Sequence, residues 1–109
     1  MFKDFKLLRV LKFEWMRSEV ELPNEIGNMI HLRYFSLRYS NIKRLPSSVA
    51  NLTCLQTLDF RAFVTLESPN VVGRMKQLRH LYFRMFGFTI GKQKLSSLGN
   101  LQTLDINFK

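Results

Sequence analysis

Large apolar side chains recur along this chain at a nearly constant interval. Five six-residue segments carry a leucine at the first position and a large apolar residue at the fourth and sixth, while the second, third and fifth positions are mostly polar. Alternate residues of a β-strand point to opposite faces, so the fourth and sixth positions would point inward together. The pattern therefore predicts five short strands. Their cores are spaced by 24, 23, 23 and 23 residues and begin at Leu8, Leu32, Leu55, Leu78 and Leu101.

The segments between the predicted strands repeat as well. Residues 22–32 and 45–55 align throughout, and the next unit keeps its proline, whereas the fourth unit has Lys92 in its place. Proline has a fixed φ that suits the opening of a helical turn, and apolar pairs spaced by three indicate one face of a short helix or 3₁₀ turn. The prolines are Pro23, Pro46 and Pro69, and the pairs are Ile26/Met29, Val49/Leu52 and Val72/Met75.

The two halves together define one repeating unit of strand, turn and short helix. The L-x-x-L-x-L strand pattern with a period of about 20 to 29 residues is typical of a leucine-rich repeat. No unit can bury its apolar residues alone, so the units must stack. We expect one domain over residues 1–109, an α/β solenoid of five units. It would have a curved parallel β-sheet on the concave face, short helical or 3₁₀ turns or loops on the convex face, and no polar cap at either end.

Longer motifs resemble a particular family. The run LPNEIGNMIHLRYFSLRYSNIKRLPSSVANLTCLQTLDFR resembles the early repeats of plant intracellular nucleotide-binding leucine-rich-repeat immune receptors, the disease-resistance proteins. FKLLRVLKF and GRMKQLRHLYF resemble that family's first repeat and a following one, most closely in the coiled-coil subclass. The resemblance implies a defence role, in which the repeats sense an effector or a guarded host protein, or pack on the receptor's nucleotide-binding module.

Two points limit that resemblance. The nucleotide-binding module is missing from this sequence, so nucleotide binding is not carried over. A general intracellular signalling scaffold of the Ras-associated leucine-rich-repeat type is the alternative, because its units also carry LP-x-x-[IL]. The 24-residue first unit and the fourth unit without proline fit the immune receptors better than the regular units of that scaffold.

The net charge of the chain indicates which kind of partner it would bind. Seventeen Lys and Arg residues against eight Asp and Glu give a formal net charge of +9, which implies an acidic partner or neighbouring domain. Nucleic acid is less favoured than an acidic protein, because the aromatic residues largely occupy core positions. No apolar run approaches the roughly 18 residues of a membrane span. A single cysteine, Cys54, and the lack of a signal peptide predict a cytoplasmic location.

The outward strand positions hold the candidate binding residues. Position seven carries arginine in three successive units and position eight carries Trp15 and Tyr39, and arginine beside such aromatics is typical of interface hot spots. Like charges directly opposite in a sheet are destabilising, so we expect a compensating group. The predicted contact surface for an acidic protein consists of Trp15, Arg33, Arg38, Tyr39, Arg61, Arg79, Tyr82 and Arg84. The alternative is a basic face that is only solvated.

No constellation in the repeat pattern indicates catalysis. A nucleophile, an acid–base pair or a metal-ligand set would have to converge in a pocket, and none is evident, so we expect no enzyme activity, cofactor, metal or small-molecule substrate. Asp59 and Asp105 face outward two strands apart, near 10 Å at about 4.8 Å per strand, but no third group supports them. Phe63 and Phe86 are expected to stack as an aromatic spine inside the turns.

Overall fold

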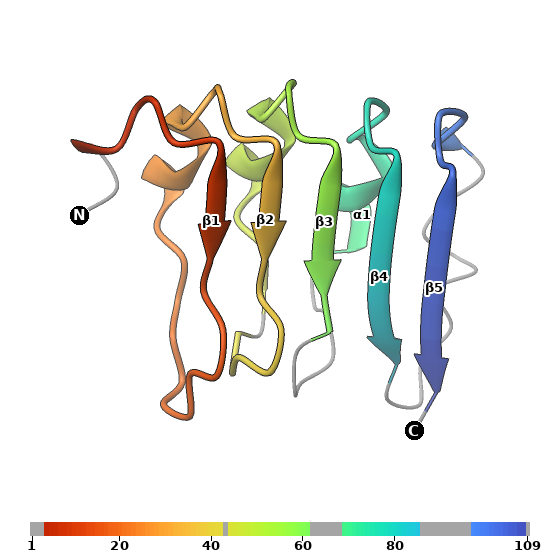
Figure 1. Ribbon diagram of the computed structural model, residues 1–109. Helices are drawn as coiled ribbons and strands as arrows, with labels where there is room; N and C mark the ends of the chain where they lie inside the picture. Colours follow the sequence, from red (N-terminus) through yellow and green to blue (C-terminus); the bar gives the residue numbers. More distant parts are fainter. Residues whose placement is uncertain (1–3, 43, 62–68, 86–96, 109) are drawn as a thin grey trace.

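Five parallel strands form a single sheet in chain order, as the repeat predicts. The computed structural model describes residues 4–42, 44–61, 69–85 and 97–108. In Figure 1 the strands lie side by side in the order β1-β2-β3-β4-β5, with the short helices behind them. The strands are β1 (Val10–Lys12), β2 (Tyr34–Ser36), β3 (Thr57–Phe60), β4 (His80–Met85) and β5 (Thr103–Phe108). Each begins two residues after the predicted start of its core.

The strand register places equivalent positions of successive units opposite one another. The fourth positions pair in a continuous row across all five strands, and the sixth positions Phe60, Phe83 and Ile106 pair across the last three. Backbone hydrogen bonds extend the ladder beyond β1 and β2, from Phe13 N to Ser36 O at 2.8 Å and from Leu37 N to Asp59 O at 2.8 Å. The predicted in-phase stacking of five units is therefore confirmed. The paired fourth positions are Leu11, Phe35, Leu58, Leu81 and Leu104.

The convex side carries one short helix at each of the three prolines, which follows Pro23 and Pro46 but begins at Pro69 itself. These are the 3₁₀-helices η2 (Asn24–Asn28) and η3 (Ser47–Asn51) and the α-helix α1 (Pro69–Gly73). Pro23 and Pro46 are extended, with ψ of 159° and 149°, and each carbonyl accepts the first helical hydrogen bond. Proline has no N–H to leave unpaired at a helix start, so the LP motif ends the extended segment and begins the turn.

The core lies between the sheet and these helices. Side chains at the first, fourth and sixth strand positions of the middle units are fully or almost fully buried, and so are the apolar pairs of the helices. The rings of Phe60 and Phe83 stand 6.3 Å apart in adjacent units. Coverage falls at the two edges of the sheet, where Leu11 is only half-buried and Leu104 is 47% exposed. Each unit is thus buried mainly by its neighbours, as a solenoid requires.

The helices η2 and η3 pack at close range through a glycine. A Cβ built on Gly27 would lie 2.6 Å from both the Cβ and the carbonyl oxygen of Ser48. Only a residue without a side chain allows that approach. No helix in the described segments is long and apolar enough to span a membrane. Phe63 and Phe86, expected to form an aromatic spine, lie outside the described residues.

Candidate functional site

Two aromatic residues stand side by side just after β1 and β2. Trp15 and Tyr39 have positive φ values of 61° and 56°, and their rings stack with centroids 4.2 Å apart and an interplanar angle of 24°. The backbone ladder holds them one unit apart, because Trp15 N donates to Arg38 O at 3.1 Å and Tyr39 N donates to Arg61 O at 2.9 Å. The regular stacking of the coils therefore brings position eight of two units together, as predicted.

Asp59 compensates the arginines of position seven. Arg61 binds it with two nitrogens, Nε to Oδ1 at 2.9 Å and a terminal nitrogen to Oδ2 at 2.6 Å. The Arg61 backbone N–H also donates to Oδ1 at 3.3 Å. Arg38 lies farther away, with Nε 3.7 Å from Oδ2. The expectation that a group offsets the arginine column is confirmed for these two arginines.

Both arginines hold their positive charge firmly. The pKa of Arg61 is raised above its usual value, chiefly by the side-chain hydrogen bond with Asp59 and despite partial burial. The pKa of Arg38 is also raised, chiefly by a side-chain hydrogen bond with Tyr39, while burial and the charge of Arg61 oppose the rise. Because both shifts raise pKa values that are already far above neutrality, the two guanidiniums stay charged throughout the physiological range.

The prediction that Asp59 is simply outward-facing needs a correction. It lies on the outer face of β3 but is only 2% exposed, because Arg61 folds over it. Ser36, one strand earlier in the same row, is fully buried and donates its hydroxyl to the Glu14 carboxylate. A buried polar layer thus underlies the arginines. The D-x-R spacing, which places two opposite charges on one face of a strand, is the sequence signal that could have revealed it.

Tyr82 completes the group on the β4 side. It pairs in register with Asp59, and the Arg61 guanidinium carbon lies 5.0 Å from its ring centroid. The Arg38 guanidinium carbon lies 5.2 Å from the ring centroid of Tyr39, the next residue in the sequence. Cation–π contacts of this kind fix the plane of a guanidinium against a ring. We call these six residues the aromatic–arginine cluster: Trp15, Arg38, Tyr39, Asp59, Arg61 and Tyr82.

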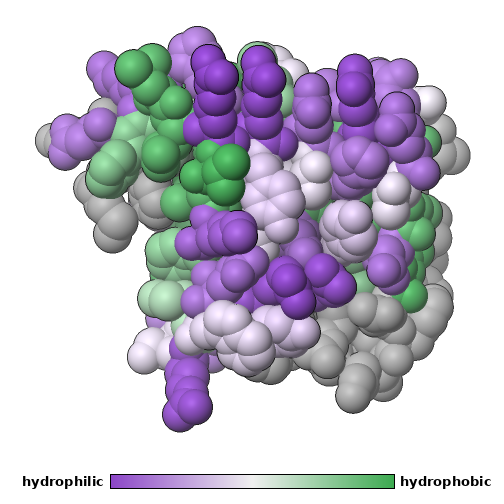
Figure 2. Space-filling view, viewed as in Figure 1, coloured by the Kyte–Doolittle hydropathy of each residue, from purple (hydrophilic) through white to green (hydrophobic). Residues whose placement is uncertain are grey.

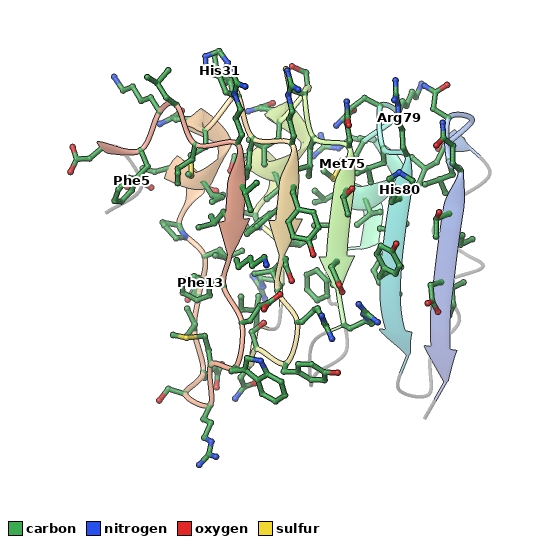
Figure 3. All side chains as sticks on the ribbon, viewed as in Figure 1. Phe5, Phe13, His31, Met75, Arg79 and His80 are labelled. Atoms are coloured by element: carbon green, nitrogen blue, oxygen red, sulfur yellow. The ribbon has the colours of Figure 1, made fainter. Side chains whose placement is uncertain are left out.

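The predicted surface is divided rather than continuous. Arg33 and Arg79 are exposed at the beginnings of their strands, where hydrophilic side chains gather along one edge of the face in Figure 2. Figure 3 shows Arg79 at that edge. Arg33 precedes Arg38 by five residues, about 16 Å along an extended strand, so the two belong to different ends of the sheet. Arg84 lies in β4 opposite Asn107, and its side chain is outside the described part.

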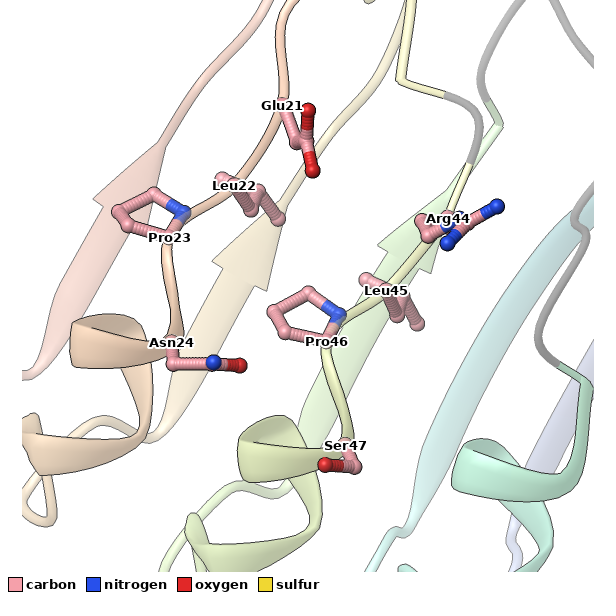
Figure 4. Close-up of a pocket in the computed structure, with 8 residues that line it drawn as sticks. All are labelled: Glu21, Leu22, Pro23, Asn24, Arg44, Leu45, Pro46 and Ser47. Atoms are coloured by element: carbon pink, nitrogen blue, oxygen red, sulfur yellow. The ribbon is translucent and has the colours of Figure 1, made fainter.

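A pocket of about 580 Å³ that the sequence did not indicate opens between the LP turns of the first two complete units. Equivalent residues of both units line it, including the exposed and oppositely charged Glu21 and Arg44 (Figure 4). Nothing in its lining combines a nucleophile with a base. Within the described ranges, no three His, Cys, Asp or Glu side chains gather as metal ligands. The lining residues are Glu21, Leu22, Pro23, Asn24, Arg44, Leu45, Pro46 and Ser47.

Comparison with known proteins agrees with the geometry. The family model for leucine-rich repeat regions matches residues 1–109. The disease resistance protein RPP8 of Arabidopsis thaliana is 44% identical over 62 residues, covering 56% of this chain and 7% of RPP8. The disease resistance protein RPH8A of the same plant is 42% identical over 60 residues, covering 54% of the chain and 7% of the relative. The chain therefore spans only about a fourteenth of the length of these relatives.

A solved structure supports the same fold. The plant peptide hormone receptor RGFR1 in complex with RGF2 superimposes with a TM-score of 0.68 at 27% identity, over 95% of this chain and 18% of the receptor. The in-phase register, the LP turns and the match along the whole sequence all indicate the same family. The chain belongs to the leucine-rich repeat regions, and the relatives it matches are plant disease resistance proteins.

Proposed function

We propose that this chain is the non-catalytic protein-recognition module of a plant disease-resistance protein, acting in the defence response. It would sense a pathogen effector or a guarded host protein, dock on the receptor's own nucleotide-binding module, or do both. The relatives support this assignment over a general signalling scaffold, because the matched proteins carry disease resistance in their names. A cytoplasmic location and an acidic protein partner belong to the same proposal.

The aromatic–arginine cluster is the observation that carries the proposal. Trp15 is 68% exposed, although a large aromatic side chain usually gains by burial. Arg38 lies against the ring of Tyr39, on which Trp15 stacks, and Arg61 lies against the ring of Tyr82 on β4. Trp, Tyr and Arg together are the residues most enriched in the energetic centres of protein interfaces. With a formal charge of +9, the chain would attract an acidic surface and speed its encounter.

Two experiments test this function. Sequencing the gene around this segment should show a P-loop and a nucleotide-binding module encoded with it, and a gene without them would remove the receptor assignment. In co-purification from plant cells, Arg38→Glu combined with Arg61→Glu and Arg84→Glu should release the tagged chain from that module, while the circular dichroism spectrum of the variant stays that of the folded chain although Asp59 has lost its partner.

The matched control has equal charge reversal at the other end of the strands. Arg9→Glu with Arg33→Glu and Arg79→Glu changes the net charge by the same amount and should reduce recovery less. Equal loss in both triple variants would show that only net charge matters. Unchanged recovery of the first variant at moderate salt would contradict docking through this face.

Nucleic-acid binding is the second candidate, favoured only by the net charge. Affinity for random duplex DNA that falls steeply with salt would revive it, since the slope counts the phosphates neutralised.

A further inference from the structure

The two arginines of the aromatic–arginine cluster are not equivalent. Arg61 uses Nε and a terminal nitrogen on both oxygens of Asp59, at 2.9 Å and 2.6 Å. Arg38 Nε is 3.7 Å from Oδ2, the oxygen that Arg61 already holds at the shorter distance. This Nε is buried and has no hydrogen-bond partner among the described residues. The Asp59 carboxylate therefore forms hydrogen bonds with the Arg61 side chain and only a longer ion pair with Arg38.

Exposure follows the same asymmetry. The Arg38 side chain is 36% exposed and that of Arg61 is 24%, while Asp59 at 2% is closed to solvent. Asp59 already occupies Nε–H and one terminal N–H of Arg61 and offsets its charge, so a partner carboxylate gains less at Arg61 than at Arg38. Arg38 has one side-chain hydrogen bond, to Tyr39, and its contact with Asp59 is longer than a hydrogen bond, so a partner carboxylate can bind its remaining terminal N–H groups without displacing Asp59.

The neighbouring Trp15 has an unfavourable backbone conformation, and burial of its side chain in the core does not compensate for it. Positive φ is unfavourable for a residue with a side chain, because Cβ comes too close to the backbone. Trp15 accepts that conformation and still leaves 68% of its surface exposed. Strained residues held by their surroundings cluster at binding sites. Its stacking on Tyr39, against which Arg38 also lies, joins an apolar platform to the underused guanidinium.

We propose that Trp15, Tyr39 and Arg38 form a recognition slot for an acidic loop of a partner protein. A partner Asp or Glu carboxylate binds the Arg38 guanidinium, and an adjacent planar or apolar side chain lies on Trp15. Asp59 is a positioning residue, which keeps Arg61 out of the contact and holds it beside Tyr82. This inference rests on the proposed function of the face as a protein-recognition surface and names the partner chemistry at its centre.

The test is a titration of the full ¹⁵N-labelled chain with two blocked peptides. Acetyl-Gly-Trp-Asp-Gly-amide carries the proposed pair, and acetyl-Gly-Trp-Asn-Gly-amide differs only by the charge. The acidic peptide should shift the Arg38 Nε–H and Trp15 Nε1–H resonances to saturation and move Arg61 Nε–H little. The Asn peptide should bind about tenfold more weakly, the loss expected when a charge-assisted hydrogen bond is removed.

Variants separate the slot from folding. Arg38→Lys keeps the charge but loses the planar fork, and should weaken binding of the acidic peptide about tenfold, whereas Arg9→Lys, an exposed residue outside the cluster, should change it by less than about threefold. Trp15→Asn, a residue that tolerates positive φ, should also weaken binding while the amide spectrum stays dispersed.

Three results would overturn the slot. The first is a shift of the Arg61 Nε–H resonance while that of Arg38 does not move, and the second is equal affinity for both peptides. The third is no resonance shift with about 10 mM peptide, since even weak binding would be detected at that concentration. None of these results decides the proposed function, because that is judged by co-purification with the charge-reversal variants. Loss of co-purification without peptide binding at Arg38 would retain the recognition face and remove the slot.

Discussion

At the scale of single residues, alternation along a strand predicts which face a side chain is on but not how deeply it is covered. Arg38, Arg61 and Tyr82 lie on the outer face as expected from the repeat. The burial of Asp59 depends on the Arg61 side chain folding back over it, which a period of two cannot reveal. The positive φ of Trp15 and Tyr39 has no sequence signal either, since glycine and asparagine usually mark that conformation.

Asp59→Asn is predicted to destabilise the fold by about 1–3 kcal/mol, because Arg61 would lose its charged acceptor and would then repel Arg38 across the sheet. Partial exposure of both arginines keeps the effect at the lower part of that range. Urea unfolding followed by circular dichroism measures it. Asp105→Asn, at the equivalent position two strands away and half-buried, is the control and should lose much less. Equal losses would mean that the Asp59 contacts contribute little.

Trp15→Gly should leave the free energy of unfolding within about 1 kcal/mol of the wild type. Glycine removes the strain of positive φ, and the lost stacking on Tyr39 is of similar size. The same urea experiment gives the answer. A loss of several kcal/mol would show that the exposed tryptophan serves the fold rather than a partner.

At the scale of elements, the sequence predicts most of what is observed. The LP motifs mark the starts of η2 and η3, and Ile26, Met29, Val49 and Leu52 are all fully buried as their spacing indicates. The distance between neighbouring helices is harder to predict from the sequence, because it depends on the contact of Gly27 with Ser48 in the next unit. Glycine at this position aligns with Ala50 in the following unit, so the repeat alone gives no reason for it.

Gly27→Ala is expected to cost about 1–3 kcal/mol, since its methyl group would overlap backbone atoms that cannot move independently of η3. Thermal and urea unfolding both report it. Gly99→Ala is the matched control, because a Cβ there has nothing within 4 Å, and it should be neutral or slightly stabilising. A neutral Gly27→Ala would mean that η2 and η3 separate easily.

At the scale of the molecule, the five-stranded order and the shared core follow from the period alone. The division of the outer face into two groups could also have been predicted, because positions two and seven are five residues apart. What the repeat could not supply is the extent of coverage at the sheet edges, where Leu11 is half-buried while its row partner Leu58 is fully buried.

The stack should therefore lose stability unevenly. Leu58→Ala is expected to cost about 2–5 kcal/mol, and Leu11→Ala clearly less, because the cavity left by Leu58 has neighbours on both sides. Native-state hydrogen exchange should show the same order, with the amides of β3 protected longest. Comparable protection of β1 and β3 would contradict a nearest-neighbour stack.

The contact of Arg61 with the buried Asp59, close to Arg38, has a consequence for any change of residues on this surface. In most of the sheet, an outer side chain could be exchanged coil by coil without disturbing the interior. Here a single exchange at Arg61 would strand a carboxylate that has almost no contact with water. Asp59 and Arg61, which belong to the same coil, are thus the smallest pair that can be exchanged on this surface, and natural or designed variation should accept paired changes there more readily than single ones.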